Sequence, residues 1–448
     1  MELQALLNGI VNIIMNKFMI KNFNIKTCKL AMIGLGYVGL PIAIEFGKKR
    51  KVIGFDLNKS RINELKKNID CNLEISKKEF KSSKKLVFTN KIQELKDCEI
   101  FIVSIPTPID NKKKPDLSLL KNCCVMIGSI IKNGDLVIFE STVYPGVTEE
   151  ICAPIIQKKS GLKFNQDFFC GYSPERINPG DKNHRLSNIV KITSGSTPEV
   201  SKIVDWLYKQ IIKTGTYNVP SIKVAEAAKV IENTQRDVNI ALINELSIIF
   251  DKLNIDTKSV LDAANTKWNF LPFKPGLVGG HCIGVDPYYL AYKSLKVGHN
   301  PKMILAGRKI NDQMPLYLAN RIKHMMKKKK MDYVNAKILI MGFTFKENCP
   351  DFRNTKVADL INGIKKYNKT KIDIYDPWIN KKEVKKIYGF DLIKYPSKKK
   401  YDLVVFAVAH DEFKKFTKNQ IKDLVKTKHI IYDLKNLFKS KNSNIQFY

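Results

Sequence analysis

The sequence lacks the cysteine and histidine patterns that indicate a disulfide framework or a metal site. Its nine cysteines are an odd number, are scattered along the chain and include no Cys-x-x-Cys pair, and none of its six histidines stands at metal-ligand spacing. These features favour a reducing compartment and argue against a structural zinc ion. We therefore expect no metal in the functional site.

The sequence also lacks a long uninterrupted apolar run and a good signal peptide. Residues 1–28 contain an apolar stretch, but Asn8 and Asn12 interrupt it, Glu2 precedes it, and it is too short to span a bilayer. We interpret residues 1–28 as a short amphipathic extension, and a mis-assigned start, with Met19 as the first residue, explains them equally well. Without a signal or a span, the expected location is the cytoplasm.

Acidic residues are few compared with basic ones. The chain of 448 residues has 77 Lys and Arg against 43 Asp and Glu, a formal net charge of +34. Such a balance raises the hypothesis of an anionic partner such as nucleic acid. However, the lysines are spread along the chain, and the densest runs (327–330 and 398–400) lack the interleaved aromatic residues of a single-strand platform. We interpret these runs as solvated surface and expect neither nucleic acid nor membrane as a partner.

Short apolar runs alternate with helical patterns in the first half of the chain. An apolar run at 29–33 is followed by a glycine-rich turn, a helical pattern at 40–48 and a second apolar run at 51–55. The same rhythm continues through further apolar runs at 86–89, 100–105 and 136–140. This alternation predicts an α/β fold with a doubly wound, mostly parallel sheet.

Helix breakers become rare between residues 221 and 253, where apolar residues recur at helical spacing. A helix of ~30 residues would be ~45 Å long, so we expect it to connect two domains or to build a dimer interface. A break into two helices at Asn233 or Asp237 is the alternative. A second α/β rhythm begins near residue 337. The predicted organisation is an extension (1–28), a first α/β domain (29–220), a central helical region (221–330) and a second α/β domain (331–448).

The glycine-rich turn at 34–39 has the pattern Gly-x-Gly-x-x-Gly. Gly34 allows a tight turn, Gly36 lets the backbone approach a pyrophosphate, and Gly39 lets helix and strand pack closely. Asp56 ends the next predicted strand, where a carboxylate accepts hydrogen bonds from ribose hydroxyls and disfavours a 2′-phosphate. The pattern therefore predicts a Rossmann-type site for NAD. Arg61 can contact the adenosine end, although by itself it would be a solvated helix residue.

Hydroxyl groups follow two of the predicted strands, in the segments 104–108 and 140–142. Ligands bind at the carboxyl ends of parallel strands, so Thr107 and Thr142 are candidates for contact with the nicotinamide half of the cofactor. Ordinary strand-end turns are the alternative.

Cys282 follows two glycines and a histidine, and Asp286 lies four residues further on. A cysteine in such company is a nucleophile if its thiolate is stabilised, whereas a buried inert cysteine is the usual alternative. Lys229 and Asn233 lie four residues apart and share one face of the predicted long helix. On a cleft they can hold an oxyanion and relay a proton, and periodicity alone would make them surface residues.

Taken together, these motifs resemble the family of UDP-sugar 6-dehydrogenases, which act on UDP-glucose, UDP-N-acetylglucosamine, UDP-N-acetylgalactosamine or UDP-N-acetylmannosamine. The resemblance covers residues 29–440. The motifs that carry it are Gly34-x-Gly36-Tyr37-Val38-Gly39-Leu40-Pro41, Glu140-Ser141-Thr142-Val143, Ser173-Pro174-Glu175-Arg176, Lys229-x-x-x-Asn233, Gly279-Gly280-His281-Cys282-x-x-x-Asp286, and Gly342-Phe343-Thr344-Phe345-Lys346 with Arg353.

The resemblance implies an N-terminal NAD-binding domain, a central dimerisation region, a C-terminal UDP-binding domain and a homodimer or higher homo-oligomer. It also implies a four-electron oxidation of the sugar C6, in which Cys282 holds the intermediate aldehyde as a thiohemiacetal and then as a thioester. Lys229, Asn233 and Asp286 are then expected to steady an oxyanion and an ordered water. Glu175, near Thr142, is expected to activate water for thioester hydrolysis.

The family also implies two sets of binding residues. The expected cofactor contacts are Gly34, Gly36, Tyr37, Val38, Gly39, Asp56, Arg61, Thr107, Thr142 and Arg353. The expected substrate contacts are Glu175, Arg176, Lys229, Asn233, Arg236, Phe273, Gly276 and Lys346, with the segment 270–276 as a loop that covers the substrate.

The form of the Ser173-Pro174-Glu175-Arg176 motif separates branches of the family. UDP-glucose enzymes commonly have Asn-Pro-Glu-Phe-Leu there, whereas this form and the segment 346–351 resemble the N-acetylhexosamine branch. We therefore expect UDP-N-acetylglucosamine or UDP-N-acetylgalactosamine as substrate, for a surface polysaccharide such as capsule or O-antigen. UDP-glucose and UDP-N-acetylmannosamine are the alternatives. Two other functions are more distant alternatives: a two-electron β-hydroxyacid dehydrogenase and an NAD sensor without turnover.

Overall fold

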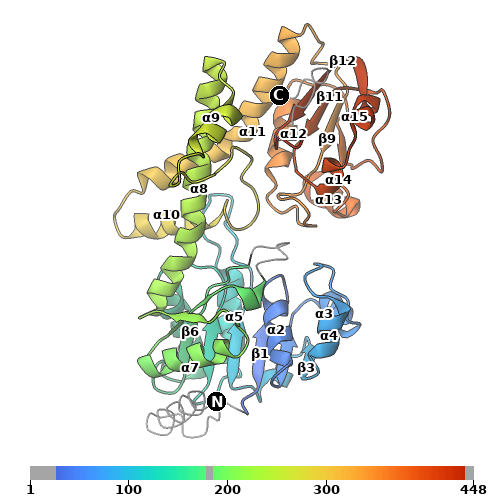
Figure 1. The fold of residues 1–448 in the computed structure, drawn as a ribbon. Coiled ribbons are helices and arrows are strands. Elements are labelled where there is room, and N and C mark those ends of the chain that lie inside the picture. The colour runs from blue at the N-terminus through green and yellow to red at the C-terminus, as the bar shows by residue number, and fades with distance from the viewer. Residues whose placement is uncertain (1–26, 178–184, 439–448) are drawn as a thin grey trace. The chain divides into compact units, whose positions relative to one another are not determined.

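The computed structural model describes residues 27–177 and 185–438, and the predicted extension at 1–28 lies almost wholly outside them. The chain divides into two compact units (Figure 1). The first unit comprises Met1–Glu232 and Tyr288–His299, and the second comprises Asn233–Pro287 and Asn300–Tyr448. Within the described part of the chain, no helix is both long enough and apolar enough to cross a membrane.

The first unit is built on an eight-stranded sheet with the order β3-β2-β1-β4-β5-β6-β7-β8. The strands are β1 (Leu30–Ile33), β2 (Val52–Phe55), β3 (Leu86–Thr89), β4 (Ile100–Val103), β5 (Leu136–Phe139), β6 (Phe169–Tyr172), β7 (Lys191–Gly195) and β8 (Thr216–Asn218). Every residue of β1, β4 and β5 is buried, as expected for parallel strands covered on both faces. The first six strands have the order of dinucleotide-binding sheets, which confirms the predicted α/β class.

Strands β7 and β8 are the exceptions to the parallel pattern, because β7 runs antiparallel to β6 and β8 runs parallel to β7. The helices of this unit are α2 (Gly39–Gly47), α3 (Lys59–Lys66), α4 (Lys77–Ser82), α5 (Ser118–Gly128), α6 (Ala153–Ser160) and α7 (Pro198–Lys209). Shorter helical turns are η1 (Ile92–Leu95), η2 (Thr148–Cys152) and η3 (Leu186–Asn188). Local sequence fixes helix starts: the Asn58 side chain accepts the backbone N–H groups of Ser60 and Arg61 and so caps α3.

Helix α8 (Ile222–Leu253) has 32 residues and continues from the first unit into the second. The alternative of two shorter helices is therefore wrong. The buried face of α8 carries the polar side chains of Glu226, Lys229, Asn233, Asp237 and Asn244 beside apolar residues such as Val230 and Ile243. Four of the apolar residues that predicted the helix are instead substantially exposed, namely Val224, Ile231, Leu242 and Ile249.

The second unit contains a four-stranded parallel sheet with the order β10-β9-β11-β12. Its strands are β9 (Ile338–Met341), β10 (Asp373–Tyr375), β11 (Tyr401–Phe406) and β12 (Val425–Asp433). The remaining helices among the described residues are α9 (Thr257–Ala264), α10 (Asp286–Lys296, which passes into the first unit), α11 (Lys302–Lys328), α12 (Lys356–Lys365), α13 (Lys381–Tyr388), α14 (Asp411–Lys414) and α15 (Lys418–Leu424). The predicted second α/β domain is confirmed.

A buried ion pair joins α8 to α11. An Arg308 guanidinium nitrogen lies 2.6 Å from Asp237 Oδ1, and both side chains are at most 2% exposed. Asn311 donates to the same carboxylate oxygen over 2.7 Å and accepts from Asn244 over 2.8 Å. Asp237 therefore holds α11 against α8 and does not break the helix.

Replacing Arg308 with leucine leaves a buried carboxylate without its cation. We expect Arg308→Leu to lose about 3–5 kcal/mol of unfolding free energy, the usual cost of removing one partner of a buried pair. Lys258→Ala, which breaks the exposed Lys258–Asp262 pair of α9, should lose less than about 1 kcal/mol. Denaturant titration of both variants measures the difference, and equal losses would contradict the role given to Arg308.

Candidate functional site

The turn between β1 and α2 has the geometry of a dinucleotide-binding loop. Gly34 has φ +90°, and a Cβ there would lie 2.3 Å from the Ser104 carbonyl oxygen. A Cβ at Gly39 would lie 1.9 Å from the Gly34 carbonyl oxygen, so any larger residue would push the helix off the strand. A Cβ at Gly36 would meet nothing within 4 Å. The loop is therefore closed on its protein side and open at Gly36, which fits a pyrophosphate approaching the helix N-terminus.

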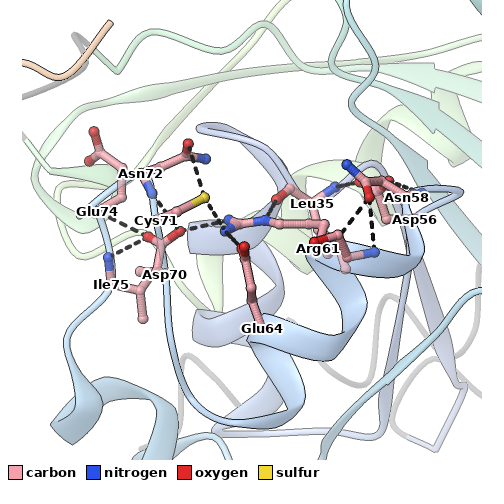
Figure 2. A network of polar contacts seen from close by, with 11 residues as sticks. Leu35, Asp56, Asn58, Arg61, Glu64, Asp70, Cys71, Asn72, Glu74 and Ile75 are labelled. Carbon is pink, nitrogen blue, oxygen red and sulfur yellow. Dashed lines mark hydrogen bonds and ion pairs between the residues drawn. The ribbon is translucent and has the colours of Figure 1, made fainter. Parts of the chain in front are cut away.

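Asp56 ends β2 and lies beside this turn (Figure 2). Its Oδ2 accepts the backbone N–H of Leu35 over 3.0 Å, and its Oδ1 accepts that of Asn58 over 2.9 Å. The carboxylate is partly exposed. It is thus held at the position from which the carboxylate of the dinucleotide motif binds a ribose. The remaining lone pairs on its two oxygens can accept hydrogen bonds from the ribose hydroxyls.

Arg61, by contrast, faces into the protein. Its Nε donates to the Leu35 carbonyl oxygen over 3.0 Å, and a terminal nitrogen lies 2.7 Å from Asp70 Oδ1 (Figure 2). The residue is 8% exposed. Asp70 also accepts the backbone N–H groups of Glu74 and Ile75. The structure therefore gives Arg61 a bracing role, tying the glycine-rich turn to the loop after α3, where the sequence had suggested contact with adenosine.

The hydroxyl-bearing loops after β4 and β5 are bonded to each other. Thr107 Oγ1 donates to the Thr142 carbonyl oxygen over 2.6 Å, and the Ile105 N–H donates to Ser141 Oγ over 3.0 Å. The buried Tyr289 hydroxyl donates to the Thr107 carbonyl oxygen over 2.6 Å. Thr107 and Thr142 are thus brought together at the carboxyl edge of the sheet, the edge that carries ligands in such folds.

Glu175 lies in the loop after β6 and is nearly buried. Its Oε1 accepts the backbone N–H groups of Arg176 and Ile177, and its Oε2 lies 3.4 Å from the Lys191 ammonium. The Arg176 guanidinium pairs with Glu232 of α8 over 2.9 Å and donates to the Val190 carbonyl oxygen. Sequence reasoning missed Lys191, because β7 has the sequence Lys-Ile-Thr-Ser-Gly and no apolar pattern marks it as a buried strand.

In the second unit, the cysteine loop is bonded to α8. Asn233 Nδ2 donates to Asp286 Oδ2 over 2.6 Å, and the Asp286 N–H donates to the Cys282 carbonyl oxygen over 2.8 Å. Asn233 and Asp286 are buried, while Cys282 is partly exposed. Lys229, also buried, precedes Asn233 by one turn of α8. The nucleophile predicted from sequence thus shares one hydrogen-bonded chain with the predicted amide and carboxylate.

The same loop packs against the segment after β9. A Cβ at Gly279 would lie 2.7 Å from the Asn354 carbonyl oxygen, and one at Gly280 would lie 2.7 Å from the Phe345 ring. The Gly280 N–H and carbonyl both bond Asn354, each over 3.3 Å. Only glycines permit this approach, which holds Cys282 near the motif that contains Lys346 and Arg353.

Asp351 organises that motif. It accepts two hydrogen bonds from Arg353 Nε, at 2.9 and 3.0 Å, and it lies 3.5 Å from His281 Nδ1. The Arg353 side chain remains 46% exposed. Lys346 is partly exposed in the loop before it. Asp351 was not singled out from the sequence, although its place two residues before the arginine allows this short-range chelation.

The buried side chain of His410 also holds the loop that contains Lys346 and Asp351. His410 Nδ1 accepts the Asn348 N–H over 3.0 Å, and its Nε2 lies 3.1 Å from both Asp376 Oδ2 and Thr344 Oγ1. Asp376 also accepts the N–H groups of Phe343 and Thr344. The bond to His410 helps to hold the pKa of Asp376 below its usual value against the effect of burial, which acts to raise it.

The predicted substrate loop is anchored at one end. Asn244 on α8 exchanges two hydrogen bonds with Gly276, 3.0 Å to its carbonyl oxygen and 2.8 Å from its N–H. Phe273 is partly exposed and Arg236 is exposed. Among the described residues, no group of three or more His, Cys, Asp or Glu side chains is arranged to hold a metal ion.

The strand order of the first unit and its glycine-rich turn are those of an NAD-dependent dehydrogenase. Three family models match the chain: the NAD binding domain of the UDP-glucose/GDP-mannose dehydrogenase family at residues 28–212, its central domain at 223–313 and its UDP binding domain at 339–440. The protein belongs to the UDP-glucose/GDP-mannose dehydrogenase family. This confirms the resemblance found in the sequence and NAD as its cofactor.

Individual relatives agree with this assignment. A UDP-N-acetyl-D-glucosamine 6-dehydrogenase of Pseudomonas aeruginosa is 55% identical, over 94% of this chain and 100% of the relative. One of Salmonella typhi is 53% identical, over 95% of this chain and 100% of the relative. The solved structure of a UDP-D-ManNAc dehydrogenase from Pyrococcus horikoshii matches with a TM-score of 0.84 at 28% identity, covering 94% of this chain and 98% of that one.

The nucleotide turn offers a matched pair of variants. We expect Gly36→Ala to fold normally, because its Cβ meets open space, and to weaken NAD binding at least about tenfold, a loss of ~1.4 kcal/mol, because the methyl group occupies the path of the pyrophosphate. Gly39→Ala should instead lower the melting temperature, because its Cβ collides with backbone. Calorimetric NAD titration and thermal denaturation measure both. Unchanged NAD affinity in Gly36→Ala would contradict this placement of the cofactor.

Proposed function

We propose that this protein is a UDP-N-acetylglucosamine 6-dehydrogenase that oxidises the C6 hydroxymethyl group of the sugar to a carboxylate. The observation that carries the proposal is the 55% identity to a relative of that name along 94% of this chain. UDP-N-acetylmannosamine is the second candidate, supported by the TM-score of 0.84, but at only 28% identity. UDP-N-acetylgalactosamine, which differs from the glucosamine compound only at C4, is a third.

The aldehyde can give up a second hydride only after a nucleophile or water adds to its carbonyl, and we assign this addition to a cysteine. NAD, when bound, accepts one hydride in each half of the reaction. Between the halves, the Cys282 sulfur adds to the C6 aldehyde as a thiohemiacetal, which becomes a thioester when the second hydride leaves C6. Water then breaks the C–S bond, releasing the carboxylate and restoring the thiol.

We assign the oxyanion of these steps to α8. Asp286 orients the Asn233 amide through the 2.6 Å hydrogen bond, and the second N–H of that amide can donate to the C6 oxygen. Lys229, one turn earlier, adds a positive charge for the same oxygen. The bond from the Asp286 N–H to the Cys282 carbonyl fixes the loop from which the sulfur attacks.

We assign the hydrolytic half to Glu175, with Thr142 near the water, and the binding of the UDP-sugar to Lys346, Arg176, Arg236, Phe273 and Gly276. Arg353, chelated by Asp351 but still exposed, is assigned to the cofactor. Cation and amide donors suit these tasks because both ligands carry diphosphates.

We further propose a homo-oligomer built through the exposed apolar residues of α8, because apolar patches on helices commonly mark protein interfaces. NAD dependence and the scattered cysteines support a cytoplasmic enzyme. The uronic acid product suits surface-polysaccharide biosynthesis, including capsule and O-antigen.

The first test is the covalent step. We expect Cys282→Ser to lose net NADH production while its NAD affinity is unchanged. The control is Cys98→Ala, which removes a thiol whose pKa burial raises to about 12, and it should retain activity. NADH absorbance and NAD titration provide the measurements. Turnover of Cys282→Ser near that of the unmodified protein would rule out the covalent mechanism.

The second test is the substrate. We expect kcat/KM for UDP-N-acetylglucosamine to exceed that for UDP-glucose by roughly 10–200-fold, the range that pocket contacts supply. UDP-N-acetylgalactosamine and UDP-N-acetylmannosamine complete the panel, and two NADH should form per uronic acid. A higher kcat/KM for any other sugar refutes the proposed substrate, and one NADH per turnover favours a two-electron dehydrogenase.

A further inference from the structure

A buried group of four ionisable side chains lies where β5 and β6 end. Lys191 and Glu140 are each 2% exposed, Glu175 is 7% exposed, and Tyr208 of α7 is fully buried. They meet because β7 runs antiparallel to β6, so that Lys191, the first residue of β7, lies beside the segment that follows β6. The direction of this one strand thus brings a lysine to the edge of the sheet that binds ligands.

The Lys191 ammonium has three hydrogen-bond acceptors for its three protons. Nζ lies 2.5 Å from Glu140 Oε2, 3.0 Å from the Pro174 carbonyl oxygen and 3.4 Å from Glu175 Oε2. The Tyr208 hydroxyl donates to the other oxygen of Glu140. Lys191 therefore holds the Ser-Pro-Glu turn twice, once through its backbone and once through the glutamate side chain.

Stability alone does not account for this group. A buried ion pair is often no more stabilising than apolar residues of the same volume. We therefore expect Lys191 to fix the positions of its neighbours more than to raise the free energy of unfolding. The positive charge of Lys191 also lies beside the Glu175 carboxylate. Burial raises the pKa of Glu140 to about 7, although Lys191 opposes the rise. When Glu140 carries a proton, the ammonium faces a single carboxylate, that of Glu175.

We propose that Lys191, held by Glu140 and Tyr208, is a positioning residue for thioester hydrolysis: it fixes the Ser173-Pro174-Glu175 turn and the direction of the Glu175 carboxylate. The inference rests on the proposed function, in which Glu175 activates the water. Loss of Lys191 should then slow the hydrolytic half of the reaction and leave hydride transfer intact, a division that a merely structural lysine would not produce.

The test compares Lys191→Met, which keeps the length of the side chain without its charge, with Lys191→Arg, using UDP-N-acetylglucosamine and NAD. We expect Lys191→Met to retain its first burst of NADH and its NAD affinity, while the steady-state kcat falls by about 10–100-fold, part of the contribution of a general base. Intact-mass spectrometry of quenched samples should show an acyl adduct on Cys282. Hydroxylamine, which attacks thioesters without a base, should release it, and Lys191→Arg should restore part of the rate.

Two references keep the outcomes distinct. Glu175→Gln should accumulate the same adduct; if it does not, the proposed role of Glu175 fails, whatever Lys191 does. If Glu175→Gln accumulates adduct and Lys191→Met hydrolyses at the normal rate, or loses burst and steady state by the same factor, the inference about Lys191 is overturned. Should Lys191→Met fold poorly, because it leaves two carboxylates together, Lys191→Met with Glu140→Gln removes the excess charge and must show the same accumulation.

Discussion

The buried face of α8 imposes a constraint on which much of the structure depends: it carries several polar or charged side chains, and each of these needs a partner. Glu226 accepts the N–H groups of Gly146 and Thr148 in the first unit. Further along the helix, in the second unit, Asn233 binds Asp286 and Asn244 binds Gly276. An unpaired polar group at these depths would cost several kcal/mol. The helix therefore fixes three separate loops, including the one that follows the β5 strand end and the one that contains the cysteine.

In the cysteine loop, a small number of contacts likewise fixes several groups. The Asp286 side chain accepts a hydrogen bond from the Asn233 amide, and the Asp286 N–H donates to the Cys282 carbonyl oxygen. One residue therefore fixes both the proposed oxyanion donor and the loop of the proposed nucleophile. On the other side, the glycines before the cysteine allow contact with Phe345 and Asn354. Since pre-organised geometry supplies much of the rate in covalent catalysis, a loop held from two sides is what the chemistry requires.

The parts of the fold that were predicted from sequence are those in which burial on both faces makes the strand almost wholly apolar. Strands β1, β4 and β5 are apolar throughout because helices cover both faces of the sheet. Strand β7 was not predicted, since Lys191 and Ser194 interrupt its apolar pattern, and both are buried by partners that are distant in sequence. The long helix was predicted from apolar spacing, but its buried face also carries Lys229, Asn233 and Asp237. Arg61 was assigned to the adenosine end of the cofactor, and only its contacts with Asp70 and the Leu35 carbonyl explain why its side chain turns into the protein.

The proposed nucleophile and the proposed base are held by different kinds of contact. The Cys282 loop is held by the hydrogen bond between the Asn233 amide and the Asp286 carboxylate and by the backbone bond from Asp286 to Cys282. Glu175 instead lies beside a second carboxylate and an ammonium that come from distant segments of the chain. Of this group, Glu140 has a pKa that burial raises to about 7, although Lys191 opposes the rise. The buried lysine links the direction of one antiparallel strand to the position of the Glu175 carboxylate at the edge of the sheet.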